Sequence, residues 1–185
     1  MEIRRAADHV AMPWANGQGT TLELAVHPQG ATPASMEWRI SVATVAAPGP
    51  FSSLPGVDRV LLMLDDVEAV LSVDGAAVPM RQLDQVGFSG DSDVALTSVS
   101  APARDLNLMT RRGLWAGRLT RVDLAGVGPR AGGDLTWLLV VSGTADISDH
   151  DGTWTLGELD LARLPADAEV NGSGVGVVLG VARVQ

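Results

Sequence analysis

Short runs of apolar residues, separated by turn residues, predict a chain built almost entirely of β-strands. Apolar spacing typical of an amphipathic helix is almost absent, whereas strand-length apolar or alternating runs recur along the chain. Gly, Pro, Asp and Ser separate the runs, and we expect one short helical turn within Pro48–Pro55. Many short strands with regular turn signals favour a sandwich or barrel. The expected strands are Thr21–Val26, Trp38–Val45, Arg59–Leu64, Glu68–Asp74, Val94–Val99, Arg104–Met109, Leu114–Leu124, Leu135–Val141, Glu158–Leu164 and Val175–Val184.

The chain also repeats itself weakly at a constant offset. The apolar run that begins at Leu61 matches the run that begins at Leu138, and the match continues without a gap as far as Gly75 in the first half and Gly152 in the second. Each half then reads as strand, bend, strand, Asp-Gly hairpin and strand, since Asp-Gly suits a tight hairpin turn. We therefore expect a single domain over residues 1–185 made of two similar halves, approximately 1–113 and 114–185.

Composition narrows the classes of function. The formal net charge of −9 disfavours nucleic acid as a partner, and 46% apolar residues disfavour disorder. No segment approaches the ~20 apolar residues of a membrane-spanning helix, and no secretory signal is recognisable, so we expect a cytoplasmic protein without membrane contact. The chain has no Cys, and all 13 basic residues are Arg. A bound anion would therefore meet a planar guanidinium, and Schiff-base chemistry on Lys is excluded.

Four ordered blocks carry a resemblance to a known family. They are Met12–Thr21 (MPWANGQGTT), Trp38–Ser41 (WRIS), Gly49–Arg59 (GPFSSLPGVDR), and Gly90-Asp91 with Arg104–Gly113 (RDLNLMTRRG). Together they resemble the HutD/Ves family. The resemblance implies an all-β bicupin, with two small β-barrels or jelly-roll halves fused in one chain. It also implies an association with bacterial histidine utilisation, a pocket in the first barrel and a possible homodimer.

Many cupins hold a metal through a His-x-His pair, a Glu and a further His, and this chain lacks that set. The aligned positions fall near Ser53, Pro55, Arg59 and Asp93 in the first half, and near Arg130, Gly132, Thr136 and Val170 in the second. An Arg where a carboxylate ligand would sit repels a cation. We therefore predict no metal and no other cofactor.

Arg59 is the strongest candidate for a ligand-binding residue. It opens an apolar strand and would face the barrel interior at the aligned metal position, where a buried guanidinium needs an anion. The alternative is an Arg at a strand edge, paired with Asp58 or another carboxylate. Trp14, Asn16 and Gly17 lie in a Pro- and Gly-rich segment that could cover the pocket. Alternatively, Trp14 could simply plug a barrel end.

Two further strands carry alternating polar positions. Arg39 and Ser41 share the face opposite Trp38, Ile40 and Val42. Asp105, Asn107 and Met109 share the face opposite Leu106 and Leu108. Both polar faces could line a cavity, and both could equally be exposed to solvent.

Three functions compete. The favoured one is a non-catalytic or regulatory protein that binds a small carboxylate metabolite, such as urocanate or formylglutamate, through Arg59, Trp14, Asn16 and Asn107. The alternative is a metal-independent isomerase or lyase with Asp58 or Asp105 as the base. The third is a partner-binding domain with a vestigial pocket. No carboxylate dyad or Ser–His–Asp set is recognisable, so we name no catalytic residue and disfavour an enzyme.

Overall fold

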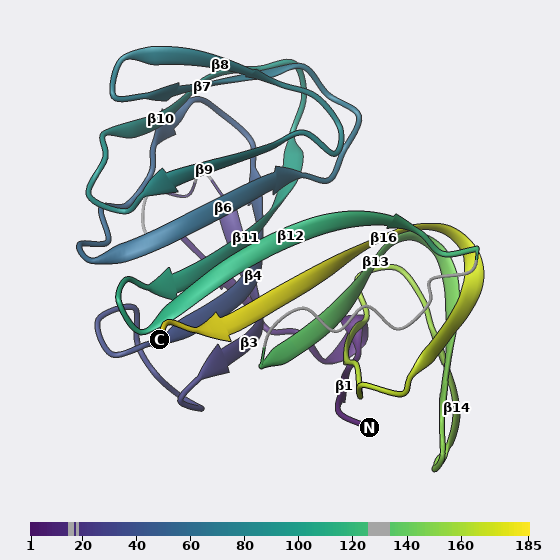
Figure 1. Cartoon of the computed structure of the whole chain (residues 1–185). Helices are drawn as coiled ribbons and strands as arrows, with labels where there is room; N and C mark the ends of the chain where they lie inside the picture. The colour runs from purple at the N-terminus through teal and green to yellow at the C-terminus, as the bar shows by residue number, and fades with distance from the viewer. Residues whose placement is uncertain (15–16, 18, 126–133) are drawn as a thin grey trace. The chain divides into compact units, whose positions relative to one another are not determined.

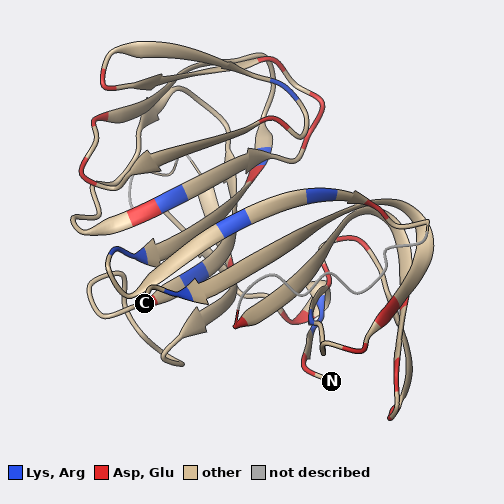
Figure 2. Ribbon diagram, in the orientation of Figure 1, with Lys and Arg blue, Asp and Glu red and all other residues tan. Residues whose placement is uncertain are grey.

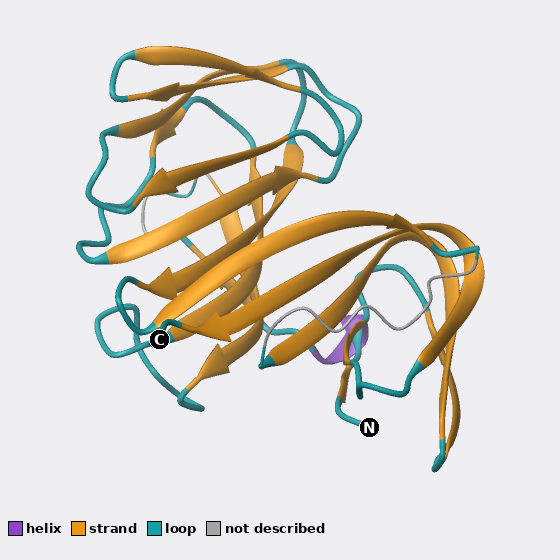
Figure 3. Cartoon of the chain, viewed as in Figure 1, coloured by secondary structure: helices purple, strands orange, loops and turns teal. Residues whose placement is uncertain are grey.

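The computed structural model describes residues 1–14, 17, 19–125 and 134–185, and these residues are almost entirely β-strand or loop. The one helical element among them is the 3-10 turn Ala6–Asp8 (Figure 3). None of the described helical residues forms a helix that could span a membrane. The chain divides into two compact units. The N-terminal unit is Val10–Ala116, and the C-terminal unit combines Met1–His9 with Gly117–Gln185.

Two antiparallel sheets form the N-terminal unit (Figure 1). The larger sheet has the spatial order β2 (Ala11–Pro13), β3 (Gly19–His27), β4 (Trp38–Val45), β11 (Ala103–Arg111), β6 (Val57–Met63) and β9 (Gln85–Ser89). The smaller sheet has the order β5 (Gly49–Pro50), β10 (Val94–Val99), β7 (Ala69–Val73) and β8 (Ala76–Met80). One apolar cluster takes side chains from both sheets, among them Leu61, Met63 and Phe88 from the larger and Leu71, Met80 and Leu96 from the smaller. The two sheets therefore pack against each other around a shared core.

The central strands of the larger sheet are buried on both faces. Trp38, Ile40 and Val42 of β4 are at most 5% exposed, as expected for the apolar face of that strand. On the opposite face of the sheet, the polar side chains of Ser41 and Asn107 are also buried, at 1% and 2% exposure. The sequence alternation thus places polar groups inside the unit rather than in solvent.

One antiparallel sheet forms the C-terminal unit. Its spatial order is β1 (Ile3–Arg4), β15 (Leu161–Arg163), β13 (Leu135–Asp149), β16 (Glu169–Arg183) and β12 (Trp115–Asp123). The hairpin partner β14 (Gly152–Leu156) pairs with the second part of β13. An apolar cluster that includes Leu138, Ile147, Leu156, Val170 and Val178 fills this unit.

Strand β13 ends later and strand β16 begins earlier than expected from sequence, because glycines allow their backbones to approach closely. Gly143 pairs with Gly174, next to a register shift between Val140 and Ser142. Both glycines have positive φ, and a Cβ on Gly174 would lie 2.1 Å from the Ser142 carbonyl oxygen. Glycines that break a strand pattern in sequence here mark the point where a continuous strand bends.

The two halves share a backbone motif. Asp74-Gly75 forms the turn between β7 and β8, whereas His150-Asp151 forms the turn between β13 and β14, one residue before the aligned pair Asp151-Gly152. After each hairpin a leucine adopts a left-handed conformation, Leu83 with φ 65° and Leu159 with φ 63°. The aspartate that follows each leucine accepts a backbone hydrogen bond at its Oδ2 atom, from Arg81 at 2.8 Å and from Gly157 at 3.0 Å. The structure therefore supports the internal repeat.

Three details differ from expectation. The hydrogen-bonded sheets of the described residues do not close into barrels, and the N-terminal unit is a two-sheet sandwich of the cupin-like kind. Residues 1–9 join the C-terminal unit because β1 pairs with β15, and the division falls after Ala116 rather than near residue 113. The helical turn expected within Pro48–Pro55 is wrong, because Gly49–Pro50 pairs with β10 as strand β5.

Candidate functional site

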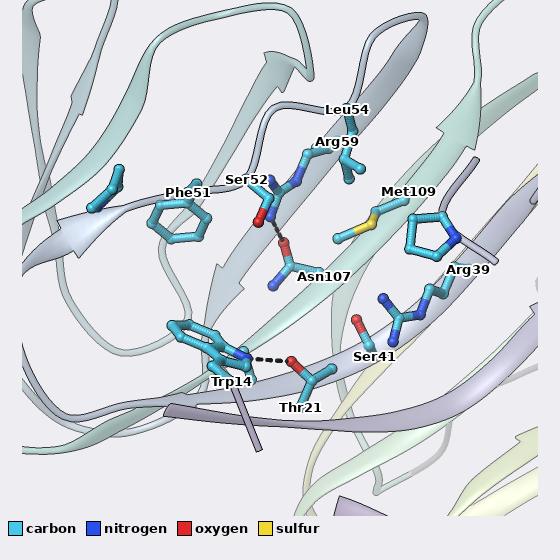
Figure 4. A pocket seen from close by; sticks show the side chains of 13 residues that line it. Trp14, Thr21, Arg39, Ser41, Phe51, Ser52, Leu54, Arg59, Asn107 and Met109 are labelled. Carbon is cyan, nitrogen blue, oxygen red and sulfur yellow. Dashed lines mark hydrogen bonds between the residues drawn. The ribbon is translucent and has the colours of Figure 1, made fainter. Parts of the chain in front are cut away.

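A cavity of about 380 Å³ lies within the N-terminal unit (Figure 4). Strands β3, β4, β5, β6 and β11 supply one part of its lining, and the segments before β3, β4 and β6 supply the rest. Its lining combines seven apolar or aromatic side chains with six polar ones. They are Trp14, Thr21, Pro33, Arg39, Ser41, Ala43, Pro50, Phe51, Ser52, Leu54, Arg59, Asn107 and Met109.

The register of the larger sheet brings two arginines to the same level of the cavity wall. Met109 of β11 pairs with Arg39 of β4 on one side and with Arg59 of β6 on the other. Asn107 lies two residues earlier on the same face of β11 and pairs with Ser41. Because alternate residues of adjacent strands share a face, these five side chains line one wall together (Figure 4).

Arg59 is buried, with 5% of its surface exposed. Its Cζ atom lies 5.0 Å from the centroid of the Phe88 ring and 5.2 Å from that of Phe51, so the guanidinium contacts two aromatic rings. Nη2 donates a hydrogen bond of 2.8 Å to Asn107 Oδ1, whereas Nε has no hydrogen-bond partner among the described residues. No described carboxylate forms an ion pair with this guanidinium.

Desolvation dominates the ionisation of Arg59. Burial lowers the pKa of its guanidinium to about 10, against the attraction of Asp105, and repulsion from Arg39 lowers it further. A pKa near 10 leaves Arg59 positively charged at neutral pH. The site therefore contains a buried cation whose direct partners are an amide and two aromatic rings.

Asp105 lies behind this wall, on the same face of β11 as Asn107. It is 1% exposed, and its Oδ1 atom accepts a short hydrogen bond from Asn107 Nδ2. Burial raises the pKa of the Asp105 carboxyl to about 7, although the charge of Arg59 and the bond from Asn107 both act in the opposite direction. Asn107 therefore connects a buried carboxyl to a buried guanidinium, with each side-chain amide atom bonded to one of them.

Arg39 differs from Arg59 in having its own counter-ion. Its Nε atom donates to Glu23 Oε2 at 2.9 Å, and its side chain is 14% exposed. Glu23 pairs with Ser41 across β3 and β4, so the ion pair follows from the strand register. Arg39 contributes a compensated positive charge to the cavity, whereas the charge of Arg59 is not compensated by direct contact.

Trp14 forms part of the apolar wall of the cavity and is anchored from two sides. Its indole Nε1 donates to Thr21 Oγ1 at 2.8 Å, and its backbone N donates to the Gly19 carbonyl at 2.9 Å. A Cβ on Gly19 would lie 2.9 Å from the Trp14 ring and 2.5 Å from the Thr44 carbonyl oxygen. Only glycine at position 19 permits this close approach of strand and ring.

Arg111 holds together two segments of the cavity rim. Its guanidinium donates to the backbone carbonyls of Pro33, Ala34 and Met36, and to that of Pro55 in the segment before β6. The first segment carries the lining residue Pro33, and the second carries Leu54. One side chain thus ties both segments to the end of β11.

The charge inside the cavity is opposite to that of the whole chain. The described residues of the lining carry two guanidinium groups and no carboxylate, although the chain has a formal net charge of −9. Figure 2 shows that the acidic positions of the upper part of the N-terminal unit lie mostly in the loops that connect strands. A small anion therefore finds positive charge in the cavity despite the acidic surface.

The structure brings together most of the residues expected at the site. Arg59, Trp14, Arg39, Ser41 and Asn107 line the cavity. Asp105 contacts Asn107 from behind without lining it, which corrects the expectation that it faces a ligand.

Two other expected residues do not join this group. Gly17 is exposed and is not part of the lining, and Asn16 lies outside the described residues. The alternative that pairs Arg59 with Asp58 or another carboxylate is wrong for the described residues, because Asp58 bonds Arg112 at 2.7 Å on the surface and Arg59 bonds the amide of Asn107.

Sequence reasoning missed Phe51 and Phe88, which flank Arg59. Phe51 lies in a Pro- and Ser-rich segment that reads as an ordinary loop, and Phe88 reaches Arg59 only through the pairing of β9 with β6. The GPFSSLPGVDR block was a signal for Phe51, whereas no local pattern marks Phe88.

Among the described residues, one group of potential metal ligands stands together, and it lies outside the cavity. Asp149, His150 and Asp151 form it at the tip of the β13–β14 hairpin, where His150 and Asp151 are exposed. The lining residues that the structure describes include no His, Cys, Asp or Glu. The lining fits an organic anion better than a cation, and the absence of a metal stays a prediction.

Comparison with known proteins relates the sequence to one family. The HutD family matches residues 6–179. An uncharacterised 21.2 kDa protein encoded in the hutC 3′ region of Pseudomonas putida is 32% identical over 124 residues, covering 66% of this chain and 65% of that protein. Protein Ves of Citrobacter koseri is 33% identical over 158 residues, covering 77% of this chain and 80% of the relative.

Solved structures agree with this assignment. HutD from Pseudomonas fluorescens SBW25, determined in a formate condition, aligns with a TM-score of 0.83 at 26% identity and covers 100% of this chain and 99% of its own. A conserved protein of unknown function from Pseudomonas aeruginosa PAO1 reaches 0.89 at 27% identity, with 98% of each chain covered. A cupin 2 conserved barrel domain protein from Leptotrichia buccalis, at 0.60 and 8% identity over 95% of this chain and 92% of its own, shares the fold alone. The chain has a cupin-like fold and belongs to the HutD family, which is associated with histidine utilisation.

Proposed function

We propose that this protein binds a small carboxylate metabolite in the cavity of the N-terminal unit, with Arg59 as the principal anchor. The observation that carries the proposal is the state of Arg59, a buried cation with no ion-paired carboxylate among the described residues. A buried charge without a direct counter-ion destabilises a protein by several kcal/mol. A carboxylate ligand supplies that counter-ion and two acceptor oxygens that match a planar guanidinium.

The remaining lining indicates what kind of carboxylate fits. Ser41, Asn107 and Arg39 offer hydrogen-bond partners beside Arg59, while Trp14 and Phe51 offer apolar surfaces. A cavity of about 380 Å³ is larger than formate requires, and it suits a carboxylate with a flat ring or short chain. Urocanate and formylglutamate have this form, and the association of the family with histidine utilisation makes them the first candidates.

A non-catalytic, metabolite-sensing role fits the cavity better than an isomerase or lyase. Asp58 is on the surface with Arg112 and does not line the cavity. Asp105 is enclosed behind Asn107, so its oxygens are separated from a ligand by an amide that transfers no proton at neutral pH. Neither carboxylate considered as a base therefore contacts the space where a ligand would bind.

Calorimetric titration with urocanate, formylglutamate and formate tests the proposal. We expect saturable binding by the wild-type protein, and about 100-fold weaker binding by Arg59→Met, because a buried charge pair with the ligand is lost while the hydrocarbon contact with the phenylalanines is kept. Arg59→Lys, which keeps the charge but not the planar fork, is expected to bind with intermediate affinity.

Arg112→Met is the matched control, because Arg112 is an exposed arginine whose partners Asp58 and Asp91 lie outside the cavity. It is expected to bind like the wild type, and thermal unfolding of each variant verifies that it is folded. Equal affinity of Arg59→Met and wild type would overturn the proposal. If NMR instead shows that the protein converts a ligand into a product, the isomerase or lyase alternative is supported.

A further inference from the structure

Arg59 faces two negative charges, rather than one, when a carboxylate occupies the cavity. We infer that ligand binding is coupled to the uptake of one proton by Asp105, so that the cavity takes up its ligand together with a proton. This inference rests on the proposed function and adds a regulatory property to the same site. It makes the occupancy of the cavity depend on pH near neutrality, although the ligand itself does not titrate there.

The coupling follows from the linear arrangement of Asp105, Asn107 and Arg59. Asp105 Oδ1 accepts from Asn107 Nδ2, and Asn107 Oδ1 accepts from Arg59 Nη2 at 2.8 Å. Asp105 is therefore the internal counter-charge of Arg59, acting through one amide rather than by direct contact. A ligand carboxylate on Arg59 takes over this role at shorter range.

Among the residues that the structure describes, Arg59 is the one cation that acts on Asp105, so no second cation is present to hold a second anion. Its neighbours across the sheet are Ala43 of β4 and Met63 of β6. The smaller sheet contributes apolar side chains to the adjoining core: Ala69, Leu71, Met80, Val94 and Leu96.

Two other arginines on nearby strands are already paired with carboxylates. Arg39 of β4 is bonded to Glu23 of β3, and Arg104, next to Asp105 in β11, is bonded to Asp65 at 2.6 Å. Arg59 is the cation that interacts with Asp105.

Two carboxylates that share one buried guanidinium repel each other, and protonation of one of them removes the repulsion. Asp105 is the group that takes the proton, because it is 1% exposed whereas a ligand lies in an open cavity. Burial already raises the pKa of Asp105 to about 7, so its protonation near neutral pH requires little additional free energy.

The exchange leaves the side chains of Asp105, Asn107 and Arg59 each with a hydrogen-bond partner. A protonated Asp105 donates its new O–H to Asn107 Oδ1 after the amide rotates, and Asn107 Nδ2 then points toward the ligand. Arg59 Nη2, released from Asn107, donates to the ligand carboxylate. No bond other than hydrogen bonds and one O–H bond on Asp105 changes, and the proton comes from solvent.

Titration calorimetry with formate, in buffers of different ionisation enthalpy, counts the protons taken up. Formate does not titrate between pH 6 and pH 9, so a proton taken up belongs to the protein. We expect nearly one proton per formate at about pH 8 and almost none at about pH 6, because Asp105 is mostly ionised at the first pH and mostly protonated at the second. The dissociation constant should rise about tenfold per pH unit above about pH 7.

Asp105→Asn removes the proton acceptor and keeps the shape of the side chain. This variant should bind formate with no proton uptake and with an affinity independent of pH between 6 and 9. Asp58→Asn is the matched control at an exposed carboxylate outside the cavity, and it should retain the proton uptake of the wild type. If the wild type binds formate without taking up a proton, the inference fails and the proposed function stands. If neither formate nor formylglutamate binds, both fail.

Discussion

The two units of this protein share a chain path but bury different side chains at equivalent positions of their strands. Arg59 of the N-terminal unit and Thr136 of the C-terminal unit occupy equivalent positions, since Leu61 matches Leu138 in the repeat. The strand pairing extends the match. Asn107 pairs with Leu61, and its counterpart Val178 pairs with Leu138. By the same register, Gly176 is the counterpart of Asp105.

The comparison separates what the fold needs from what the cavity adds. The C-terminal unit keeps the hairpin, the left-handed leucine and the aspartate turn, yet Val178 packs in its apolar core where the N-terminal unit has Asn107. A buried Arg–Asn–Asp series is therefore not required by this architecture. Because such a series destabilises a core relative to well-packed hydrocarbon, its presence in one unit points to a role in binding.

The largest effect is expected when Asn107 is replaced by valine, the residue that the C-terminal unit has at the equivalent position. Asn107→Val should lower the free energy of unfolding by about 3 kcal/mol, because Arg59 and Asp105 both lose their hydrogen-bond partner while they remain buried. Urea unfolding of the ligand-free protein measures this change.

Removing the whole network provides the control. The triple variant Arg59→Met, Asp105→Leu and Asn107→Val should recover most of the lost stability, because no buried charge remains without a partner. A triple variant less stable than Asn107→Val would show that the network stabilises the sandwich itself. It would contradict the conclusion that the architecture does not require the buried Arg–Asn–Asp series.

A smaller effect should distinguish the two aspartate turns. Asp160 is 7% exposed and accepts hydrogen bonds from Gly157 N, Ala6 N and Arg5 Nη1. Asp84 is exposed and accepts one bond, from Arg81 N. Thermal unfolding should therefore show a loss of about 2 kcal/mol for Asp160→Ala and about 1 kcal/mol for Asp84→Ala. Equal losses would mean that the bonds to residues 5 and 6 contribute nothing.

The smallest effect concerns pH. The folded-state pKa of Asp105, about 7, lies above the ordinary value of 3.8, so the folded protein binds more protons than the unfolded chain between these values. The contribution of Asp105 is therefore greatest at low pH and is lost as pH rises through about 7.

Relative to Asp105→Asn, the wild type should lose about 1 kcal/mol of unfolding free energy between pH 6 and pH 7.5. The lowered pKa values of Asp65 and Asp160 act below 3.8, outside this window. Parallel pH profiles of the two proteins, measured by urea unfolding, would contradict the assignment of this titration to Asp105.

Much of the fold could be predicted from sequence, because strand alternation and the internal repeat are local signals. The apolar face of β4 and the Asp74-Gly75 hairpin follow directly from residue order. Strand β8 was predicted only as the strand that follows the Asp-Gly hairpin, and β9 was missed, because Phe88 is the one buried residue among its five. The full length of β16 was hidden by Gly172 and Gly174, which normally weaken a strand.

The site was predictable where a residue conflicts with its surroundings. Arg59 interrupts an apolar strand, and that conflict is visible in the sequence. What surrounds it is not visible, because Phe88 and Asn107 reach Arg59 through strand pairings that only the folded register determines. For the same reason Asp105 was expected beside the ligand, although Asn107 separates it from the cavity.

The hydrogen bonds of Arg111 affect both the association rate and the affinity of a ligand. Its guanidinium binds four carbonyls on two separate segments of the cavity rim, so these segments are already ordered before a ligand binds. Ligand binding then costs the translational and rotational entropy of the ligand, without the further entropic cost of ordering these two segments. The association rate should therefore be limited by diffusion and desolvation rather than by a rearrangement of these two segments.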